Sequence, residues 1–200
     1  RPAVLVVNPA LNVRTVAELV ALVKAKGSSM SYGTPSVAHF CHFATEVFNR
    51  RAGIKVPAVP YKGEAPMIND LIGGQVDYGF GFATTVDPFV KAGRLNALAT
   101  TGAVRSPQLP DVPTFKELGM PEVEMTIWTG MAGPAGLPPE IVERLQVELG
   151  KVLRNPAIKS RREFADSEIV ASKPEAFKAF LAAERVRWSK LVKETGIKVQ

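Results

Sequence analysis

The feature that most constrains the fold is a regular alternation of two kinds of segment. Short apolar segments predict strands at residues 4–7, 30–32, 55–61, 76–82 and 95–100. Between them lie segments with helical spacing of apolar residues, and these close at Gly27, Gly53, Gly73 and Gly93. Because strands that alternate with helices form parallel sheets covered on both faces, the chain is predicted to be an α/β protein with a mostly parallel sheet.

Local signals fix several of these boundaries. Thr15 and Glu18 have the spacing of a capping box, which predicts a helix start directly after Thr15. Pro57 and Pro60 lie within a predicted strand, and proline lacks the N–H that an inner strand needs. The 55–61 strand is therefore predicted at an edge of the sheet.

The character of the sequence changes after residue 100. Residues 105–113 contain three prolines and predict an extended surface connection, and residues 114–117 predict the capped start of a short helix that ends at Gly119. Further on, the pattern predicts a strand at 123–131, a rigid turn at 133–136, a short strand at 168–171 and helices at 138–153, 156–164 and 174–195, the last with Ser172 as its N-cap. A boundary between two units is predicted near residue 125.

Composition excludes several classes of protein. No apolar run approaches the roughly 20 residues that cross a bilayer. The net charge is +6, but the basic residues are spread out and no nucleic-acid recognition motif accompanies them, so no nucleic-acid partner is predicted. Cys41 is the single cysteine, which rules out an internal disulfide and a cysteine-based metal site.

Catalytic and metal-binding patterns are weak. The sequence has no phosphate-binding loop, dinucleotide fingerprint or nucleophile elbow. His39 and His42 lie three residues apart and Glu46 is near, so a three-ligand metal site is one interpretation, but a helix start packed on the sheet is the preferred one. Cys41 and His42 point about 100° apart on a helix, so Cys41 is predicted to fill space in the core. We predict no metal, no cofactor and no catalytic residue.

Three strand-to-helix turns suit an anion. We name them turn A (residues 34–39), turn B (residues 61–64) and turn C (residues 81–84). Ligands of open α/β sheets bind beyond the carboxyl ends of strands, where the N–H groups of helix N-termini point at them. Lys62 adds a positive charge and Gly63 permits close approach. The alternative is that these are the tight turns that any such fold requires.

Several motifs together resemble one family. They are Val-Pro-Tyr-Lys-Gly at 59–63, Pro66, Asp-Leu at 70–71, Gly-Gly-Gln-Val-Asp at 73–77, Phe80, Lys-Ala-Gly-Arg-Leu at 91–95, Arg-Ser-Pro at 105–107, Leu-Pro-Asp-Val-Pro-Thr at 109–114, Trp128 and Ala-Gly-Pro-Ala-Gly at 132–136. The combination resembles the tripartite tricarboxylate transporter receptors, which are Bug-type periplasmic solute-binding proteins. The resemblance extends from Val4 to the last predicted helix.

The resemblance implies a type II periplasmic-binding-protein fold, a Venus flytrap of two α/β lobes. It implies a periplasmic receptor that gives a small organic acid to membrane permease subunits, the acid being a di- or tricarboxylate, an acidic amino acid or an aromatic carboxylate. Residues 1–125 would form the second lobe, and residues 126–200 the crossing strand and the helices of the first lobe. The chain would lack the family's N-terminal third with its glycine-rich loop, which fits its abrupt start at a strand, and it contains no signal peptide.

The resemblance also suggests which positions contact the ligand: Ser36, Val37, Ala38, His39, Phe40, Tyr61, Lys62, Gly63, Gly81 and Phe82. The amides of residues 36–39 and of Gly63, with the Tyr61 hydroxyl, would hold one carboxylate. The other lobe would close over it by a hinge at Glu124, Met125 and Trp128.

The chain departs from the family pattern at several of these ligand-contacting positions. Ser36 and Ala38 replace common glycines, His39 and Phe40 replace small hydroxyl residues, and Gly81 stands where aspartate is frequent. Phe40, Phe82 and a partly positive His39 would suit an aromatic or larger acid. The alternatives to a receptor are the ligand-sensing domain of a transcription regulator and a hydrolase or lyase with an unrecognised site.

Overall fold

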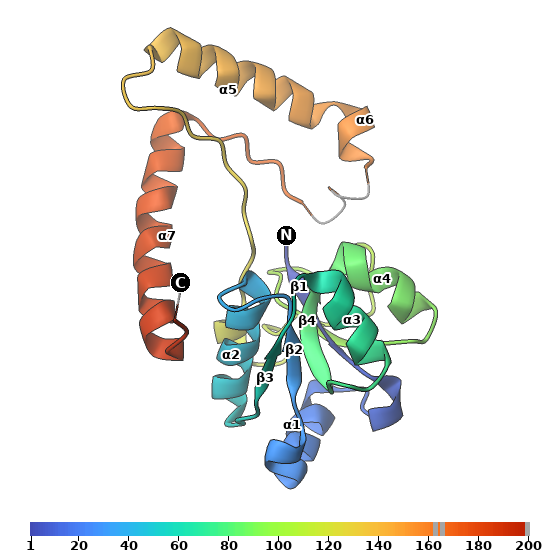
Figure 1. Cartoon of the computed structure of the whole chain (residues 1–200). Coiled ribbons are helices and arrows are strands. Elements are labelled where there is room, and N and C mark those ends of the chain that lie inside the picture. Colours follow the sequence, from blue (N-terminus) through green and yellow to red (C-terminus); the bar gives the residue numbers. More distant parts are fainter. Residues whose placement is uncertain (162–163, 165–166, 199–200) are drawn as a thin grey trace.

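The structure, a computed structural model, describes residues 1–161, 164 and 167–198. It contains one five-stranded sheet with helices packed against it, and a group of outlying helices (Figure 1). The strands are β1 (Ala3–Val7), β2 (Tyr32–Thr34), β3 (Ala58–Pro60), β4 (Tyr78–Phe82) and β5 (Asn96–Thr100). The α-helices are α1 (Val16–Lys26), α2 (Phe40–Ala52), α3 (Glu64–Ile72), α4 (Ala83–Lys91), α5 (Pro139–Arg154), α6 (Pro156–Lys159) and α7 (Pro174–Thr195).

The strand order is β3-β2-β4-β1-β5. Strand β2 pairs in parallel with β3 and β4, whereas β1 is antiparallel to both β4 and β5. The predicted α/β class is confirmed, and the sheet is mixed because β1 runs against the other strands. The short β3 lies at the edge, as its prolines predicted.

Both faces of the sheet are covered, and β1 shows how. Ala3, Leu5 and Val7 belong to a core cluster with residues of α1 and α2, while Val4 and Val6 belong to a second cluster with residues of α3 and α4. Successive side chains of a strand point to opposite faces, so an apolar run of this kind is stable only between two layers of helices. All five residues of β1 are fully buried.

Several helix ends match the sequence signals. The Glu18 amide donates to Thr15 Oγ1 (3.1 Å) and the Thr15 amide donates to Glu18 Oε2 (3.1 Å), which is the predicted capping box. Gly53 follows α2 with φ +65°, a conformation that glycine adopts without strain. Strand β2 begins at Tyr32, two residues later than predicted.

Other predicted elements are wrong. Residues 114–119 contain the reciprocal bonds of a capping box between Thr114 and Glu117, but the chain forms only turns because Gly119 (φ +73°) reverses it at once. Residues 123–131 form no strand, and residues 168–171 are also irregular. Helix α7 has the predicted bounds, but its N-cap is Lys173 and not Ser172, because Pro174 takes the first helical position. The Lys173 side chain makes no capping bond, since an ammonium group cannot accept one.

The predicted helix at 156–164 is observed only as α6, and residues 162 and 163 lie outside the described residues. The predicted strand at 123–131 fails for a geometric reason. The Met125 amide donates to Thr101 O and the Ile127 amide donates to Arg1 O, both at 2.9 Å. Since these acceptors lie on two different parts of the chain, no continuous ladder forms with one strand.

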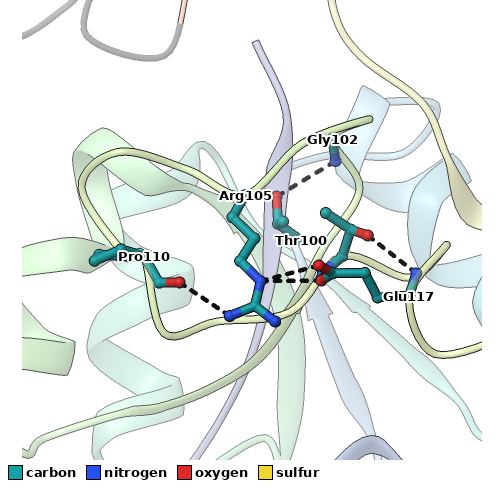
Figure 2. Close-up of polar contacts among 6 residues, drawn as sticks. Thr100, Gly102, Arg105, Pro110 and Glu117 are labelled. Carbon is teal, nitrogen blue, oxygen red and sulfur yellow. Dashed lines mark hydrogen bonds and ion pairs between the residues drawn. The ribbon is translucent and has the colours of Figure 1, made fainter.

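Arg105 makes several contacts within the connection that follows β5 (Figure 2). Arg105 Nε lies 3.1 Å from both carboxylate oxygens of Glu117, and its Nη1 donates to Pro110 O at 3.2 Å. Thr100 Oγ1 accepts a bond from the Gly102 amide at 3.4 Å. These contacts join the two ends of the surface connection that the prolines predicted.

The helices after residue 138 are arranged differently. Helices α5 and α6 lie away from the sheet, and α7 passes beside α2 (Figure 1). Trp188 of α7 makes an edge contact with Phe43 of α2 at 5.3 Å between ring centroids. Among the described helices, none is both long and apolar enough to cross a membrane.

Candidate ligand-binding site

The three turns lie along one edge of the sheet. Strands β3, β2 and β4 are neighbours and run in the same direction, so their carboxyl ends share an edge, and α2, α3 and α4 start there (Figure 1). Because β1 runs in the opposite direction, its first residues reach the same edge. The fold therefore brings together all the turns that the sequence indicated.

Turn B is bonded to turn A through the backbone. The Tyr61 amide donates to Thr34 O at 2.9 Å and the Gly63 amide donates to Pro35 O at 2.8 Å. Gly63 has φ +120°, which favours glycine. In this conformation the hydrogen of the Gly63 amide already has an acceptor, and the expected role of Gly63 in ligand binding stays a prediction.

Two histidines hold turn A. His39 is the N-cap of α2, and its Nδ1 accepts the Cys41 amide at 3.2 Å; His42 Nδ1 accepts the Ala38 amide at 3.1 Å. Burial lowers the pKa of both rings, and Glu46 opposes this effect at His42. Since each Nδ1 is an acceptor, each ring is neutral with its proton on Nε2. The expectation of a partly positive His39 is corrected accordingly.

The remaining donors of turn A are few. The His39 amide donates to Ser36 O at 3.3 Å, so it and the Ala38 amide already have acceptors. Within the part of the chain that the structure describes, the amides of Ser36, Val37 and Phe40 have no hydrogen-bond acceptor. Ser36 and Val37 are exposed, and Val37 keeps 52% of its surface accessible. Ser36 and Val37 precede the N-cap His39, so their amides belong to the turn before α2, and only the Phe40 amide lies in the first turn of the helix. Amides without an acceptor at this place can bind an anion.

In turn B, the Tyr61 side chain is bonded to α3 and Lys62 is exposed. The Tyr61 hydroxyl donates to Asp70 Oδ2 at 2.9 Å. Burial and the Asp70 carboxylate raise the pKa of Tyr61 to about 12. Its one proton is therefore directed at α3, and the expected carboxylate bond from Tyr61 is not available in this conformation. Lys62 is exposed beside the turn.

The carboxylate of Glu64, the last residue of turn B, reaches turn C, a contact that the sequence analysis missed. Glu64 Oε1 accepts the Phe82 amide at 2.5 Å and Oε2 accepts the Thr85 hydroxyl at 2.9 Å, at the start of α4. Burial raises the pKa of Glu64, against the opposing effects of these two bonds and of Arg1. A Cβ on Gly81 would lie 2.9 Å from Glu64 Oε1, so glycine leaves the room that this carboxylate uses.

Aromatic rings surround turns A and C. The Phe82 ring stacks on Phe40 at 6.0 Å and meets His39 edge-on at 6.1 Å, and the Arg1 guanidinium lies 5.3 Å from its centroid. Phe40 also approaches Trp188 of α7 at 6.5 Å. A groove of about 360 Å³ opens here, lined by Ala38, Phe40, Phe43, Thr126, Ile127, Trp128, Trp188 and Val192. The groove is apolar and reaches turn A.

The predicted hinge segment is tied on two sides. The Met125 carbonyl accepts the Thr101 hydroxyl at 2.7 Å, which joins the segment to the end of β5. Trp128 Nε1 donates to Glu184 Oε2 at 2.9 Å, and Arg187 donates to Glu124 O at 3.0 Å, which join it to α7. The hinge assignment stays a prediction.

His39 and His42 are not arranged as metal ligands. Both Nδ1 atoms accept backbone amides, and Glu46 accepts the Tyr32 hydroxyl. Among the described side chains, no three of the metal-binding types lie close enough to hold one ion. Cys41 is fully buried, as predicted, and burial raises the pKa of its thiol.

A mixed α/β sheet with helix N-termini gathered at one edge is the architecture of a lobe of a periplasmic binding protein. The chain belongs to the tripartite tricarboxylate transporter family receptors (TctC), whose profile matches residues 1–197. This confirms the family resemblance. It is a family of receptors, in agreement with the prediction that the chain is not an enzyme.

Individual relatives show the same relationship. Protein BugT of Bordetella pertussis is 32% identical over 199 residues, which is all of this chain and 61% of BugT. The structure of R. palustris Rpa4515 with adipate has a TM-score of 0.86 and 33% identity, covering 98% of this chain and 66% of that one. The periplasmic binding protein BugD has a TM-score of 0.86 and 29% identity, covering 100% and 67%. The chain thus spans about three fifths of BugT.

Proposed function

We propose that this chain is part of an extracytoplasmic receptor that captures a small organic carboxylate and delivers it to a membrane transporter. The observation that carries the proposal is that the amides of Ser36 and Val37, two exposed residues, have no acceptor among the described residues. Both residues lie just before α2, on the edge where three parallel strands end. One related structure holds adipate, a carboxylate. The proposal places the receptor in the periplasm and includes permease subunits as its partners.

The carboxylate is proposed to bind turn A through backbone donors. Hydrogen bonds from N–H groups to a carboxylate are stronger than those between neutral groups. The N-terminus of α2 adds a favourable dipole. Neutral His39 offers its Nε2–H, so the site needs no cationic side chain.

The body of the acid is proposed to lie against the aromatic groove. Phe40 and Phe82 stack beside turn A, and Trp188 extends the apolar surface. Burying an apolar group here is favourable by roughly 25 cal/mol per Å² of apolar area. An aromatic or long-chain acid therefore fits this lobe better than a short hydroxy acid.

The rest of the receptor completes the site. We propose that residues 1–125 are the second lobe and that residues 126–200 supply the crossing segment and helices of the first. The remaining length of the family's chain would then provide the opposite wall. Closure would take place about Glu124, Met125 and Trp128, since contacts to both the sheet and α7 meet there.

The test is calorimetry on the full-length protein that carries this sequence. We expect benzoate to bind more tightly than succinate or citrate. Val37→Pro removes one amide donor, and Val37→Ala, the matched control, retains it. We expect Val37→Pro to weaken benzoate binding by about tenfold or more, and Val37→Ala to change it by less than about threefold. Equal effects of the two variants, in folded protein, would contradict a role for this amide.

A further inference from the structure

The three helix starts at the carboxyl edge differ in what their amides face. At turn A, the amides of Ser36 and Val37 have no acceptor among the described residues, and both residues are exposed. At turn C, the Phe82 amide and the Thr85 hydroxyl both donate to Glu64. The start of α4 therefore already has an anion, and that anion is a side chain of α3.

Glu64 is held in this place from several directions. Each of its carboxylate oxygens has a donor, at 2.5 Å from the Phe82 amide and at 2.9 Å from the Thr85 hydroxyl. Gly81 leaves the necessary space, because a Cβ there would approach Glu64 Oε1 to 2.9 Å. The side chain is half-buried, so its charge is only partly screened by water.

A carboxylate at turn C has a consequence for a ligand bound at turn A. The two turns are neighbours, since the Phe82 ring stacks on Phe40 and meets His39. A second ligand carboxylate that extended toward α4 would meet Glu64, and two carboxylates in one partly buried place repel each other. An uncharged apolar group would instead meet the faces of Phe40 and Phe82.

A positively charged ligand group would fit beside Glu64 less well than an uncharged one. The Arg1 guanidinium lies 5.3 Å from the centroid of the Phe82 ring, and the amide of the same residue donates to Glu64. Burial raises the pKa of Glu64, and the charge of Arg1 opposes this effect. A ligand amine placed here would be repelled by the guanidinium.

We propose that Glu64 determines ligand specificity by filling the anion position at the start of α4, so that the receptor selects acids with one carboxylate and an uncharged apolar body. This inference rests on the proposed function, because it assumes that turn A binds a carboxylate. A purely structural role of Glu64, joining α3 to α4, would alter stability but would not alter the preference between acids.

The test uses two acids of equal chain length, hexanoate with one carboxylate and adipate with two. Calorimetry is carried out on the full-length protein and on Glu64→Gln, Glu64→Ala and Glu143→Gln. Glu143 is exposed on α5, so its variant controls for the loss of one negative charge. We expect the unchanged protein and Glu143→Gln to bind hexanoate about tenfold more tightly than adipate. In both Glu64 variants we expect adipate to gain about tenfold and hexanoate to change by less than about threefold.

Each outcome of the calorimetry either supports or refutes the role of Glu64 in ligand specificity. If the Glu64 variants bind hexanoate but keep the ratio between the two acids unchanged, the specificity role of Glu64 is refuted and carboxylate binding stands. If no form binds hexanoate, adipate or benzoate, the proposed function fails and this inference fails with it. Circular dichroism checks folding, and Glu64→Gln, which retains the size of the side chain, decides the question if Glu64→Ala does not fold.

Discussion

The sheet region, residues 1–127, and the helical region, residues 138–198, are stabilised in different ways. In the sheet region every residue of β1 is buried and two core clusters cover the two faces. In the helical region Gly150 is the only buried residue of α5, and Glu184 is the only one of α7. The first region is held by its own core, whereas α5 and α7 of the second each bury a single residue.

The exposed side of α5 shows what this difference means. Ile141, Leu145 and Val152 are exposed, with the spacing of one helix face. A hollow of about 470 Å³ lies along this helix, beside Ile141 and Leu145. Exposed apolar rows usually mark a surface that another part of a protein covers. This supports the proposal that the helical region belongs with the other lobe.

The largest expected effect compares one core residue with one helix residue. Phe48 is fully buried and packs against Phe80 and Phe115, while Leu145 is half exposed. We expect Phe48→Ala to lower the free energy of unfolding by about 3–5 kcal/mol, since it leaves a cavity. Leu145→Ala should change it by less than about 0.5 kcal/mol. Urea unfolding monitored by circular dichroism measures both, and similar losses would show that the two regions are not held differently.

The next effect concerns the contact between α7 and Trp128, which follows the sheet region directly. Glu184 Oε2 accepts the indole N–H groups of both Trp128 and Trp188 at 2.9 Å, and Glu184 is buried. Glu184→Ala leaves both indoles without this acceptor, so we expect a loss of about 1–3 kcal/mol. Hydrogen exchange should increase in α7 and remain unchanged in β1. Faster exchange throughout the sheet would mean that α7 is part of the same cooperative unit.

A pH effect of intermediate size should arise in the sheet region, which contains both histidines. Burial lowers the pKa of His39 and His42 below the value of about 6.5 in the unfolded chain. The folded state then binds fewer protons, so this stability is present above about pH 6.5 and is lost as the pH falls through the folded pKa values. The raised pKa of Glu64 acts in the opposite sense, because its contribution is lost as the pH rises.

The variant His39→Asn with His42→Gln separates these contributions, because asparagine retains an N-cap acceptor. Unfolding free energies between pH 5 and 8 should rise with pH less steeply in the double variant. The difference should not exceed about 1.4 kcal/mol per pH unit for each histidine. Identical slopes in the two proteins would indicate that neither histidine is neutral because of burial.

The smallest effect is expected at the surface of the sheet region. The ion pair of Arg105 with Glu117 is about half exposed on both sides. Exposed pairs contribute about 0.2–1 kcal/mol, so Arg105→Ala should lower stability by no more than that. A greater loss in urea unfolding would show that the connection of Figure 2 is coupled to the core.

The elements of the sheet region could be predicted because their signals are local. The capping box of Thr15 and Glu18 and the glycine after α2 act within a few residues. The direction of β1 could not be predicted, because an apolar pattern does not record which strand lies beside it. The strand predicted at residues 123–131 was wrong for a related reason. The backbone amides of this segment donate to Thr101 and Arg1, which lie in two different parts of the sequence.

The site was predicted in position but not in chemistry. The three turns follow from the alternation of strands and helices. Which acceptors their N–H and O–H groups bond depends on residues that pack beside them in the fold. The Gly63 amide is engaged by Pro35, and the hydroxyl of Tyr61 by Asp70. Glu64 acts on the start of a different helix, 18 residues away from Phe82. An acidic residue in the first turn of a helix is favoured by the dipole of that helix, so the position of Glu64 in α3 does not point to a contact with α4.

The most direct measurement of the central claim is hydrogen exchange of the full-length protein with and without benzoate. If exposed amides at the carboxyl edge of the sheet bind the acid, residues 36–40 should exchange more slowly when the acid is present, while α1 at the opposite edge should not change. Slower exchange confined to segments away from turns A, B and C would contradict the claim.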